Sequence, residues 1–490
     1  MDIARPHSGR SLRGSRVALA GLAAVFLFEM LDNSILTVAL PTIGRGLHVE
    51  TTGLQWVTGA YSVVFGGSML AAGAVADRYG RRRVMLVGLV LLGAASLATA
   101  VVTTADQLIA VRVATGIAAA MTTPGSMALA FRLFDDDERR VRAITVISTV
   151  GLVGLAIGPT LGGLVLAVAP WQVLLLVNVP IAALAFVGIR AGIVRDDPAG
   201  LHRAPVDWVG AVLGTAAIVL ALVAPTRFAD GGVRDWTGWV AAVGAIVAGA
   251  GFVVRERRAE HPLLDLALLA RPLVTSGLAY KAATGLAVAG LGYLVTLQLQ
   301  LAWGWSPALA AIGMLPQVLV LVAGSWFVGP FVRRVGLEHA AWSSAAAVVV
   351  GLGVYTLLGT HGYGWVALAL ALVAAGMRVV GVVAGTNVLR GLPEDRTTIG
   401  AALVDTSSEV TSATGIAVAG TVLATVFAGR LTATPWTHTQ GLQFDGAVLI
   451  AGTVLTVLAG ALVAWASARA RRVRQETATA SRAPDTAAVG

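Results

Sequence analysis

The chain has 490 residues, of which 57% are hydrophobic and only 12% are charged, whereas soluble domains keep about a quarter of their residues charged. This small number of polar side chains cannot cover the surface of a soluble fold of this length. The composition therefore indicates a protein that is surrounded by lipid. The chain has no cysteine, which excludes disulfides and thiolate metal sites. Its net charge of +9 is not a nucleic-acid signal, because the arginines flank apolar segments instead of forming a patch.

Apolar runs follow one another along the chain, each about as long as the roughly 20 residues that cross about 30 Å of hydrocarbon. They predict an all-α polytopic membrane protein with fourteen spans. The spans are 17–41, 54–76, 84–104, 107–130, 143–168, 171–194, 207–225, 237–254, 273–301, 307–330, 340–360, 365–389, 397–427 and 446–467. The break between the eleventh and twelfth spans, 361–364, is the shortest.

The basic residues give an independent test of this topology. With the N-terminus inside, 28 of the 35 Lys and Arg residues fall in inside segments, if Arg190 at the inner end of the sixth span is counted with them, four fall in outside loops and three deeper within spans. This asymmetry is what the positive-inside rule predicts for fourteen spans with both termini cytoplasmic. The first span carries Glu29 and Asp32 and is too long for a signal peptide, so we expect it to be retained. The tails, 1–16 and 468–490, are expected to lack stable structure.

Two turns with the same spacing indicate an internal repeat. Gly73-Ala-Val-Ala-Asp77-Arg78-Tyr-Gly80-Arg81-Arg-Arg83 follows the second span, and Gly329-Pro-Phe-Val-Arg333-Arg334-Val-Gly336 follows the tenth. Parallel halves related in this way are a common plan of transporters. The sequence contains no phosphate-binding G-x-x-x-x-G-K-[ST] loop, so transport driven by ATP is disfavoured.

At these residues the chain resembles a known family. The Gly73–Arg83 turn is similar to the loop between helices two and three of the major facilitator superfamily. Segment 31–41 resembles the first-helix signature of its fourteen-span drug–proton antiporters, and 151–163 resembles the fifth-helix motif of its exporters. Segment 171–180 is similar to the W-R-W…N-V-P opening of helix six, although Gln172 and Val173 depart from it. The motifs lie in the first 180 residues, and the second half is matched by topology only.

The resemblance implies a fold and a set of motif roles. It implies two six-helix bundles, 17–194 and 273–467, with two inserted helices at 207–254. Within the loop, Asp77 can hold an arginine and latch the halves in one conformation, the alternative being that the arginines only set topology. The expected gating residues are Gly73, Asp77, Arg78, Gly80 and Arg81.

The fifth span carries small residues on one face. Gly154, Gly158 and Gly162 recur every four residues, so they allow a neighbouring helix to approach closely. Pro159 adds a kink because it removes a backbone donor, and Gly163 completes the motif. The resemblance implies that this contact biases which side of the protein opens, whereas the plain interpretation is helix packing.

Ionisable residues inside spans are costly in lipid and therefore mark functional positions. Seven of them lie away from the ends of the spans: Glu29, Asp32, Arg112, Lys281, Arg378, Asp405 and Glu409. Glu29 and Asp32 share a helix face, as do Asp405 and Glu409. Two carboxylates this close are not readily ionised together, so each pair is a candidate for proton coupling or substrate contact. The plain alternatives are a structural pair of Asp32 with Arg112 and, for the other three acids, carboxylates held near the outer ends of their spans.

The basic residues within spans have narrower roles. Arg112, which resembles a fourth-helix motif, would tune or pair with Asp32 or Glu29. Lys281 and Arg378 are expected to neutralise the acids of the second half.

These observations favour a proton-coupled antiporter that exports small hydrophobic, or hydrophobic cationic, drugs or antibiotics from a bacterial cell by alternating access. The alternatives are a dedicated exporter of one endogenous metabolite or antibiotic, and an amino-acid or organic-ion transporter. The protein is expected to be no enzyme, to use the proton gradient without cofactor, metal or ATP, and to act as a monomer in the cytoplasmic membrane.

Overall fold

The structure is a computed structural model that describes residues 12–49, 51–133, 137–196, 206–232, 234–260, 262–264, 266–392, 397–432 and 435–480. Every regular element among these residues is a helix, and long helices coincide with all fourteen predicted spans. The first half contains α1 (Leu12–Gly46), α2 (Thr51–Tyr79), α3 (Arg81–Ala98), η1 (Thr99–Val101), α4 (Ala105–Leu133), α5 (Asp137–Val168), α6 (Gln172–Leu176) and α7 (Asn178–Gly192). The middle contains α8 (Trp208–Gly231), α9 (Trp236–Arg258) and the short α10 (Leu266–Leu269). The second half contains α11 (Pro272–Leu297), η3 (Gln298–Ala302), α12 (Pro307–Gly313), α13 (Leu315–Val335), α14 (Leu337–Leu358), η4 (Gly359–His361), α15 (Tyr363–Gly391), α16 (Thr397–Val426) and α17 (His438–Ala480).

Length and hydropathy identify the membrane-spanning helices. Within the described ranges, eleven helices are long and apolar enough to cross a bilayer, and thirteen are if two bent helices each count as one span. The bent helices are α2, with 50° between Gly53–Met69 and Ala71–Tyr79, and α5, with 41° between Thr149–Leu155 and Ile157–Val168. The remaining predicted span coincides with α4, which contains Arg112. The prediction of an all-α polytopic membrane protein is confirmed.

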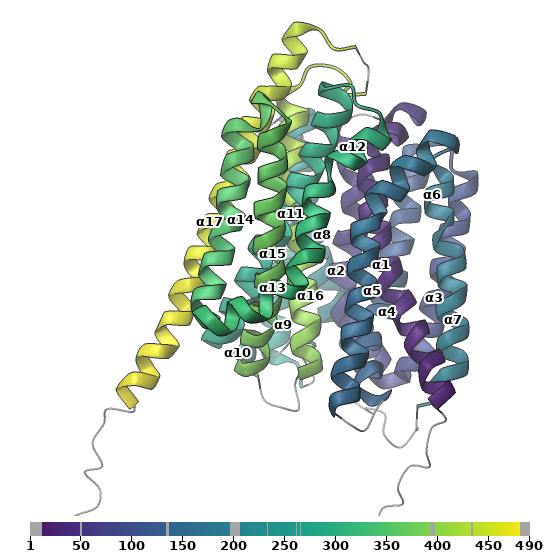
Figure 1. The fold of residues 1–490 in the computed structure, drawn as a ribbon, viewed down its shortest axis with the longest axis vertical. Coiled ribbons are helices and arrows are strands. Elements are labelled where there is room, and N and C mark those ends of the chain that lie inside the picture. Colours follow the sequence, from purple (N-terminus) through teal and green to yellow (C-terminus); the bar gives the residue numbers. More distant parts are fainter. Residues whose placement is uncertain are drawn as a thin grey trace, which may run out of the picture.

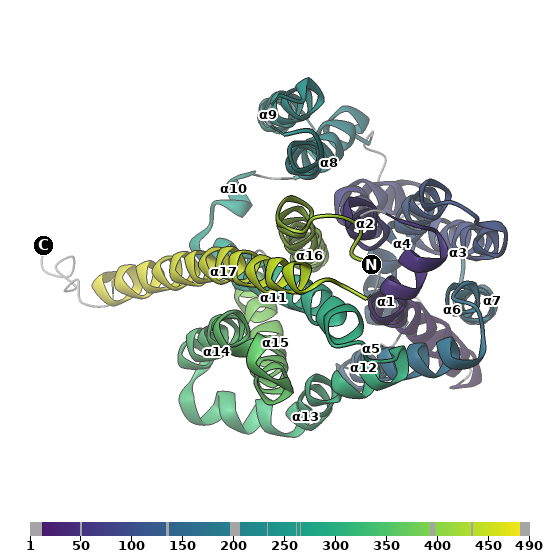
Figure 2. The ribbon, with the colours of Figure 1, turned by 90° about the horizontal axis from the view of Figure 1, so that it is seen from above.

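The helices form two bundles with a separate pair beside them. Seen from above, α1–α7 lie on one side and α11 and α13–α17 on the other, with α12 beside α5, while α8 and α9 form a pair at the periphery (Figure 2). The two inserted helices pack on each other, and α8 also contacts α2 and α16, one helix from each bundle. The first turns of α1 and the last turns of α17 lie at the same end of the molecule, the lower end in Figure 1.

The helix contacts repeat between the two bundles. In the first, α1 packs on α5 and α7, and α3 on α4 and α7. In the second, α11 packs on α16 and α17, and α14 on α15 and α17. The turns named in the sequence also match, since Gly80 and Gly336 each precede a helix with a positive φ, 98° and 79°. Glycine adopts this backbone conformation without steric cost, which explains its place at both turns.

The two bundles meet at the end of the molecule remote from the termini. There Gln300 of η3 donates a 2.8 Å hydrogen bond to the carbonyl of Val38 on α1. A Cβ atom at Gly163 of α5 would lie 2.7 Å from the carbonyl oxygen of Pro307 in α12. A Cβ atom at Gly44 would lie 2.7 Å from Cγ2 of Thr432. These contacts close this end of the molecule.

The helices differ from the predicted spans mainly at their ends. The α1 helix already begins at Leu12, and α17 continues to Ala480, so residues 12–16 and 468–480 are helical where unstructured tails were expected. Alanine and arginine favour helix, which explains the extension of α17 into the Arg-rich segment beyond the bilayer. Residues 1–11 and 481–490 lie outside the described part of the chain.

Candidate functional site

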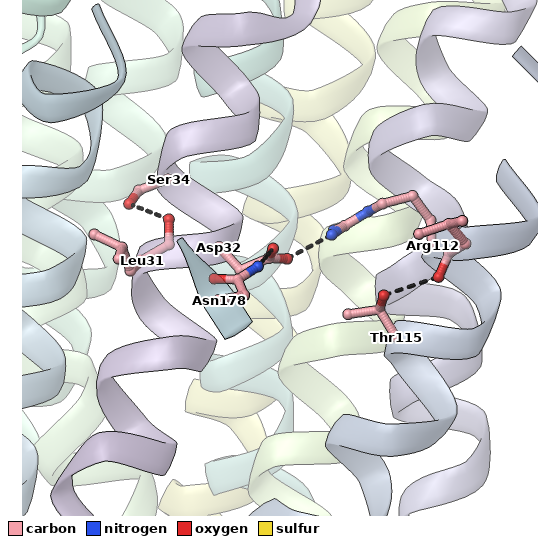
Figure 3. A network of polar contacts seen from close by, with 7 residues as sticks. Leu31, Asp32, Ser34, Arg112, Thr115 and Asn178 are labelled. Carbon is pink, nitrogen blue, oxygen red and sulfur yellow. Dashed lines mark hydrogen bonds and ion pairs between the residues drawn. The ribbon is translucent and has the colours of Figure 1, made fainter. Parts of the chain in front are cut away.

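A buried ion pair joins α1 to α4 in the first bundle. Asp32 Oδ2 lies 2.5 Å from Arg112 Nη1, and the side chains are 0% and 1% exposed. The other carboxylate oxygen, Oδ1, accepts a 2.7 Å hydrogen bond from Nδ2 of Asn178 at the start of α7 (Figure 3). The single carboxylate therefore holds three helices together. Because the pair is out of water, removal of either partner would leave a buried charge uncompensated.

Tyr61 of α2 completes the surroundings of Arg112. The Arg112 guanidinium carbon lies 4.6 Å from the centroid of the Tyr61 ring, a cation–π contact. Among the described residues, Nε and Nη2 of Arg112 and the Tyr61 hydroxyl have no hydrogen-bond partner. The network therefore contains buried donors whose hydrogen-bonding capacity is not used within the described residues.

Glu29 lies one turn from Asp32 but faces different groups. Its Oε2 accepts a 3.0 Å hydrogen bond from the Thr123 hydroxyl of α4. It also interacts electrostatically with Asp405 and Glu409 of α16, across the interface between the bundles. Glu29 therefore interacts with both acids of the second predicted pair, whereas the contacts of Asp32 are with Arg112 and Asn178.

Lys281 of α11 supplies positive charge to the acids of the second pair. It interacts with Asp405 and Glu409, and the Ser62 hydroxyl of α2 is hydrogen-bonded to Glu409. Oε2 of Glu409 is buried and has no hydrogen-bond partner within the described ranges. The aliphatic stem of Arg378 on α15 packs toward Gly324 of α13.

A cavity of about 220 Å³ lies between the bundles and reaches these residues. Glu409 and Lys281 line it together with hydroxyl groups of Ser34, Thr37, Thr58, Ser62, Thr284, Ser408 and Ser412. The rest of its wall is apolar and includes Met30, Met314, Met377, Leu155 and Val318. Methionine side chains adapt to ligands of different shape, which suits a site for apolar molecules.

The glycine stripe of α5 packs against the segment of α1 that carries the acids. A Cβ atom at Gly154 would lie 2.9 Å from Leu27 Cδ1, and one at Gly162 would lie 3.5 Å from the Ile35 carbonyl oxygen. At Gly158 it would overlap Oγ of Ser34, whose hydroxyl bonds the Gly154 carbonyl at 3.4 Å. Pro159 lines the cavity and lies in the bent part of α5, where its missing N–H removes a helix hydrogen bond.

The turn after α2 makes its described contacts within the first bundle. Asp77 Oδ1 lies 2.8 Å from Nη2 of Arg81, and the Arg78 guanidinium lies over the Tyr79 ring. A Cβ atom at Gly80 would lie 2.7 Å from Oδ2 of Asp196, which accepts a hydrogen bond from the Arg82 amide. Around Gly73 there is open space, with nothing within 4 Å of a Cβ atom built there.

Sequence reasoning missed several partners of these residues. Asn178 belonged to the sixth-helix motif but had no assigned role, and Tyr61, Thr123 and Ser62 carried no signal because single polar residues are frequent in spans. Asp196 had one weak signal, since it is an acid within the basic loop that follows the sixth span.

Comparison with known proteins places the chain among transporters. The model of the Major Facilitator Superfamily matches residues 22–416. The cephamycin export protein CmcT of Amycolatopsis lactamdurans is 33% identical over 71% of this chain and 72% of its own length. The multidrug efflux pump LfrA of Mycolicibacterium smegmatis is 29% identical over 85% of this chain and 82% of its own length.

A solved structure gives the same fold. The crystal structure of the peptide transporter POT in complex with sulfate is similar, with a TM-score of 0.66 over 93% of this chain and 95% of that one, at 16% identity. The family match covers most of the chain and agrees with its repeated bundles. The protein is therefore a multi-pass membrane transporter, not an enzyme, and it belongs to the Major Facilitator Superfamily, where it is related to the drug efflux pumps.

Proposed function

We propose that this transporter is a proton-coupled antiporter that exports small hydrophobic drugs or antibiotics, cationic ones included, across the bacterial cytoplasmic membrane. Both termini lie on the cytoplasmic side, and the two bundles open alternately to either side of the membrane. The proton gradient drives the cycle without ATP or a cofactor. The protein works as a single copy, since each chain contains both bundles and the cavity between them.

The observation that carries this proposal is the position of Asp32 on α1. On one side its carboxylate is bound by Arg112 and Asn178, and on the other side α1 packs on the glycine stripe of α5. A proton on Asp32 removes the charge that holds Arg112, so α1 is released from α4 and α7. The α5 helix touches both α1 and α12, and a shift of α1 is thereby transmitted to the closed end of the molecule.

The lining of the cavity supports the proposed class of substrate. Its wall of methionine and aliphatic side chains favours apolar compounds, and the hydroxyl groups supply a few adaptable hydrogen bonds. The Glu409 carboxylate faces this space with one oxygen unpaired among the described residues, which suits a cationic group. We therefore assign Asp32 to proton coupling, with Glu29 beside it, and Glu409 and Asp405 to cationic substrates, with Lys281 as their counter-charge.

A second candidate is the dedicated export of one antibiotic made by the host. It is favoured by the similarity to a cephamycin export protein over about 70% of both chains. The two functions use the same machinery and differ only in the breadth of compounds accepted, so a panel of substrates separates them.

The test measures transport in inside-out membrane vesicles with an imposed proton gradient. The probes are ethidium, a hydrophobic cation, and Nile red, a neutral hydrophobic dye. Uptake that requires the gradient is expected for both, and uptake of neither, with uptake of one antibiotic, would favour the dedicated exporter. Asp32→Asn should abolish gradient-driven uptake of every substrate, whereas Glu409→Gln should reduce ethidium uptake more than Nile red uptake.

The matched control is Asp106→Asn, which changes an exposed acid at the start of α4. It should leave transport unchanged. Gradient-driven uptake that survives in Asp32→Asn at the control rate would contradict the assignment of the proton site. Substrate-induced proton release that persists in all four variants that neutralise Glu29, Asp32, Asp405 or Glu409 would contradict the assignment of proton coupling to these acids, and its absence from the wild-type protein would contradict antiport itself.

A further inference from the structure

A groove of about 830 Å³ runs along the outside of the first bundle between α3 and α7. It lies away from the cavity between the bundles and shares no lining residue with it. Toward the remote end the two helices approach each other, since a Cβ atom at Gly93 would lie 3.9 Å from the Ala182 Cβ. Toward the end that carries the termini the groove extends as far as Arg82 and Arg190.

The two ends of the groove differ in chemistry. Its long wall is apolar and includes Leu86, Val87, Val90, Leu91, Ala94 and Phe186. The end toward the termini is basic, because four arginines line it from three segments of the chain, namely Arg82, Arg83, Arg190 and Arg195. A groove with an apolar wall and a basic end is complementary to an amphipathic ligand that has an anionic head and a hydrocarbon body.

Hydrogen bonds fix the basic end of the groove and turn its one acid away from the arginines. The one acid that lines the groove, Asp196, accepts a hydrogen bond from the Arg82 amide and sits against Gly80, so it is directed toward the turn. Arg82 Nη2 donates to the Arg190 carbonyl at 2.7 Å, which fixes the two helices at this point. Within the described ranges, the guanidinium groups of Arg83, Arg190 and Arg195 form no ion pair.

We propose that this groove binds one anionic glycerophospholipid, with its phosphate head group at Arg83, Arg190 and Arg195 and an acyl chain along the apolar wall. Basic pockets between membrane helices recognise such head groups, and arginine pairs with phosphate through two parallel hydrogen bonds. A zwitterionic lipid satisfies the apolar wall equally well but gains less from the arginines, so the site discriminates by charge.

The dimensions agree with one lipid leaflet. From Arg82 to Ala94 the α3 helix rises about 18 Å, at about 1.5 Å for each of twelve residues. Half of a hydrocarbon core of about 30 Å is about 15 Å. The groove therefore extends from the head-group level to the middle of the bilayer, and a single acyl chain fills it. This site does not depend on which substrate the protein transports.

The test uses the absence of cysteine from the chain to place one fluorophore. Val90 in the groove wall, 60% exposed, is changed to cysteine and labelled with bimane. The protein is reconstituted in phosphatidylcholine with increasing fractions of dibrominated phosphatidylglycerol or dibrominated phosphatidylcholine, which quench the fluorophore on contact. We expect phosphatidylglycerol to bind at this position about threefold to tenfold more tightly than phosphatidylcholine.

Two controls test whether a preference for phosphatidylglycerol arises from the arginines of the groove. A label at Ile246→Cys on α9, which is 71% exposed and away from the groove, should show equal quenching by the two lipids. In the Val90→Cys background, Arg83→Gln with Arg195→Gln should abolish the preference, whereas Arg83→Lys with Arg195→Lys should keep it. The lysine variant distinguishes loss of charge from misfolding.

Equal quenching by both lipids at Val90 would overturn the proposal. So would a preference that persists in the glutamine variant, or one of the same size at Ile246, because the charge at the groove would then not select the lipid. None of these readouts involves transport, so failure of the lipid site and failure of the proposed antiport are distinguishable.

Discussion

The Asp32 carboxylate joins three helices of the first bundle. It is fully buried and contacts Arg112 and Asn178, which come from the fourth and sixth spans. Such a pair gives little net stability compared with apolar side chains of the same size, yet loss of one partner is costly. A buried pair of this kind therefore suits the proposed proton coupling, in which its contacts change with the charge of Asp32, better than it suits a role as a source of stability.

Arg112→Met should lower the free energy of unfolding by about 3–5 kcal/mol, because it leaves the Asp32 carboxylate buried without its cation. The double variant Asp32→Asn with Arg112→Met should be more stable than the sum of the single changes predicts, with a coupling energy of about 2 kcal/mol. Thermal unfolding of the purified protein in detergent measures the order of the four midpoints. As a control, Asp106→Asn should add to Arg112→Met without coupling, and additivity in the Asp32 cycle as well would show that the two side chains do not act as a pair.

The sequence predicted which residues are ionisable within spans, but only some of their contacts. Polar residues in an apolar run are visible in the sequence, and the spacing of Glu29 and Asp32 indicated a shared helix face. Their partners lie elsewhere in the chain, since Arg112 is 80 and Asn178 is 146 residues from Asp32. Only the packing of the bundle determines that Asp32 forms an ion pair with Arg112 and that Glu29 accepts a hydrogen bond from Thr123. The contact between Asp196 and the turn after α2 could not be predicted for the same reason, because Arg82 and Asp196 lie 114 residues apart.

At the scale of elements, the contact between α1 and α5 links the charged site to the interface between the bundles. The glycine stripe lets the α5 backbone approach Leu27, Ser34 and Ile35 of α1, and Gly163 extends the same helix to α12. Side-chain contacts alone would keep two helices about 8–10 Å apart, a distance at which α1 motions would be less directly transmitted. Because of this close contact, we expect a movement of α1 to move α5 with it.

Gly158→Val should separate these two helices, because even its Cβ atom would overlap Ser34 Oγ. Overpacking of this kind should lower the free energy of unfolding by about 1–3 kcal/mol and abolish gradient-driven uptake in vesicles. The control is Gly353→Val on α14, where nothing lies within 4 Å of a Cβ atom. The combination Gly158→Ala with Ser34→Gly should restore part of the uptake, since it removes the overlapping atoms. Wild-type uptake by Gly158→Val would leave the stripe without a role in transport.

Helix positions were predictable to within a few residues, and helix breaks were not. Apolar runs fix where a chain crosses the bilayer, whereas the breaks at Val177 and Met314 and the bend of α2 depend on packing against neighbours. The bend of α5 was predictable because Pro159 removes a backbone donor. The helical ends at 12–16 and 468–480 were missed because hydropathy reports the membrane and not the helix.

At the scale of the whole molecule, the arginine distribution predicts which end is cytoplasmic. Arg234 lies between α8 and α9, at the end remote from the termini, and Glu260 follows α9 at the opposite end, and both are exposed. Arg234→Cys should therefore react with a membrane-impermeant maleimide added to whole cells, whereas Glu260→Cys should react only after the cells are opened. The reverse labelling pattern would contradict the proposed orientation of the termini.

The described conformation has its bundles joined at the end remote from the termini, which the proposed orientation makes the outer end. Alternating access requires that the contacts there separate once in every cycle, because the same cavity must open to the outside. Gly44 of α1 and Thr432, beyond α16, are in direct contact across this closed end, and neither lies among the lining residues of the cavity.

A disulfide at this place should stop transport reversibly. Gly44→Cys with Thr432→Cys brings two thiols into contact range in a chain that has no other cysteine, so oxidation should join the bundles. Gradient-driven uptake of ethidium should fall to the background of empty vesicles after oxidation and recover after reduction with dithiothreitol. Each single-cysteine variant serves as its own control and should be insensitive to the oxidant. Substrate binding should persist in the cross-linked protein, because the cavity is lined by other residues. Full transport by a quantitatively cross-linked protein would show that this end does not open during the cycle.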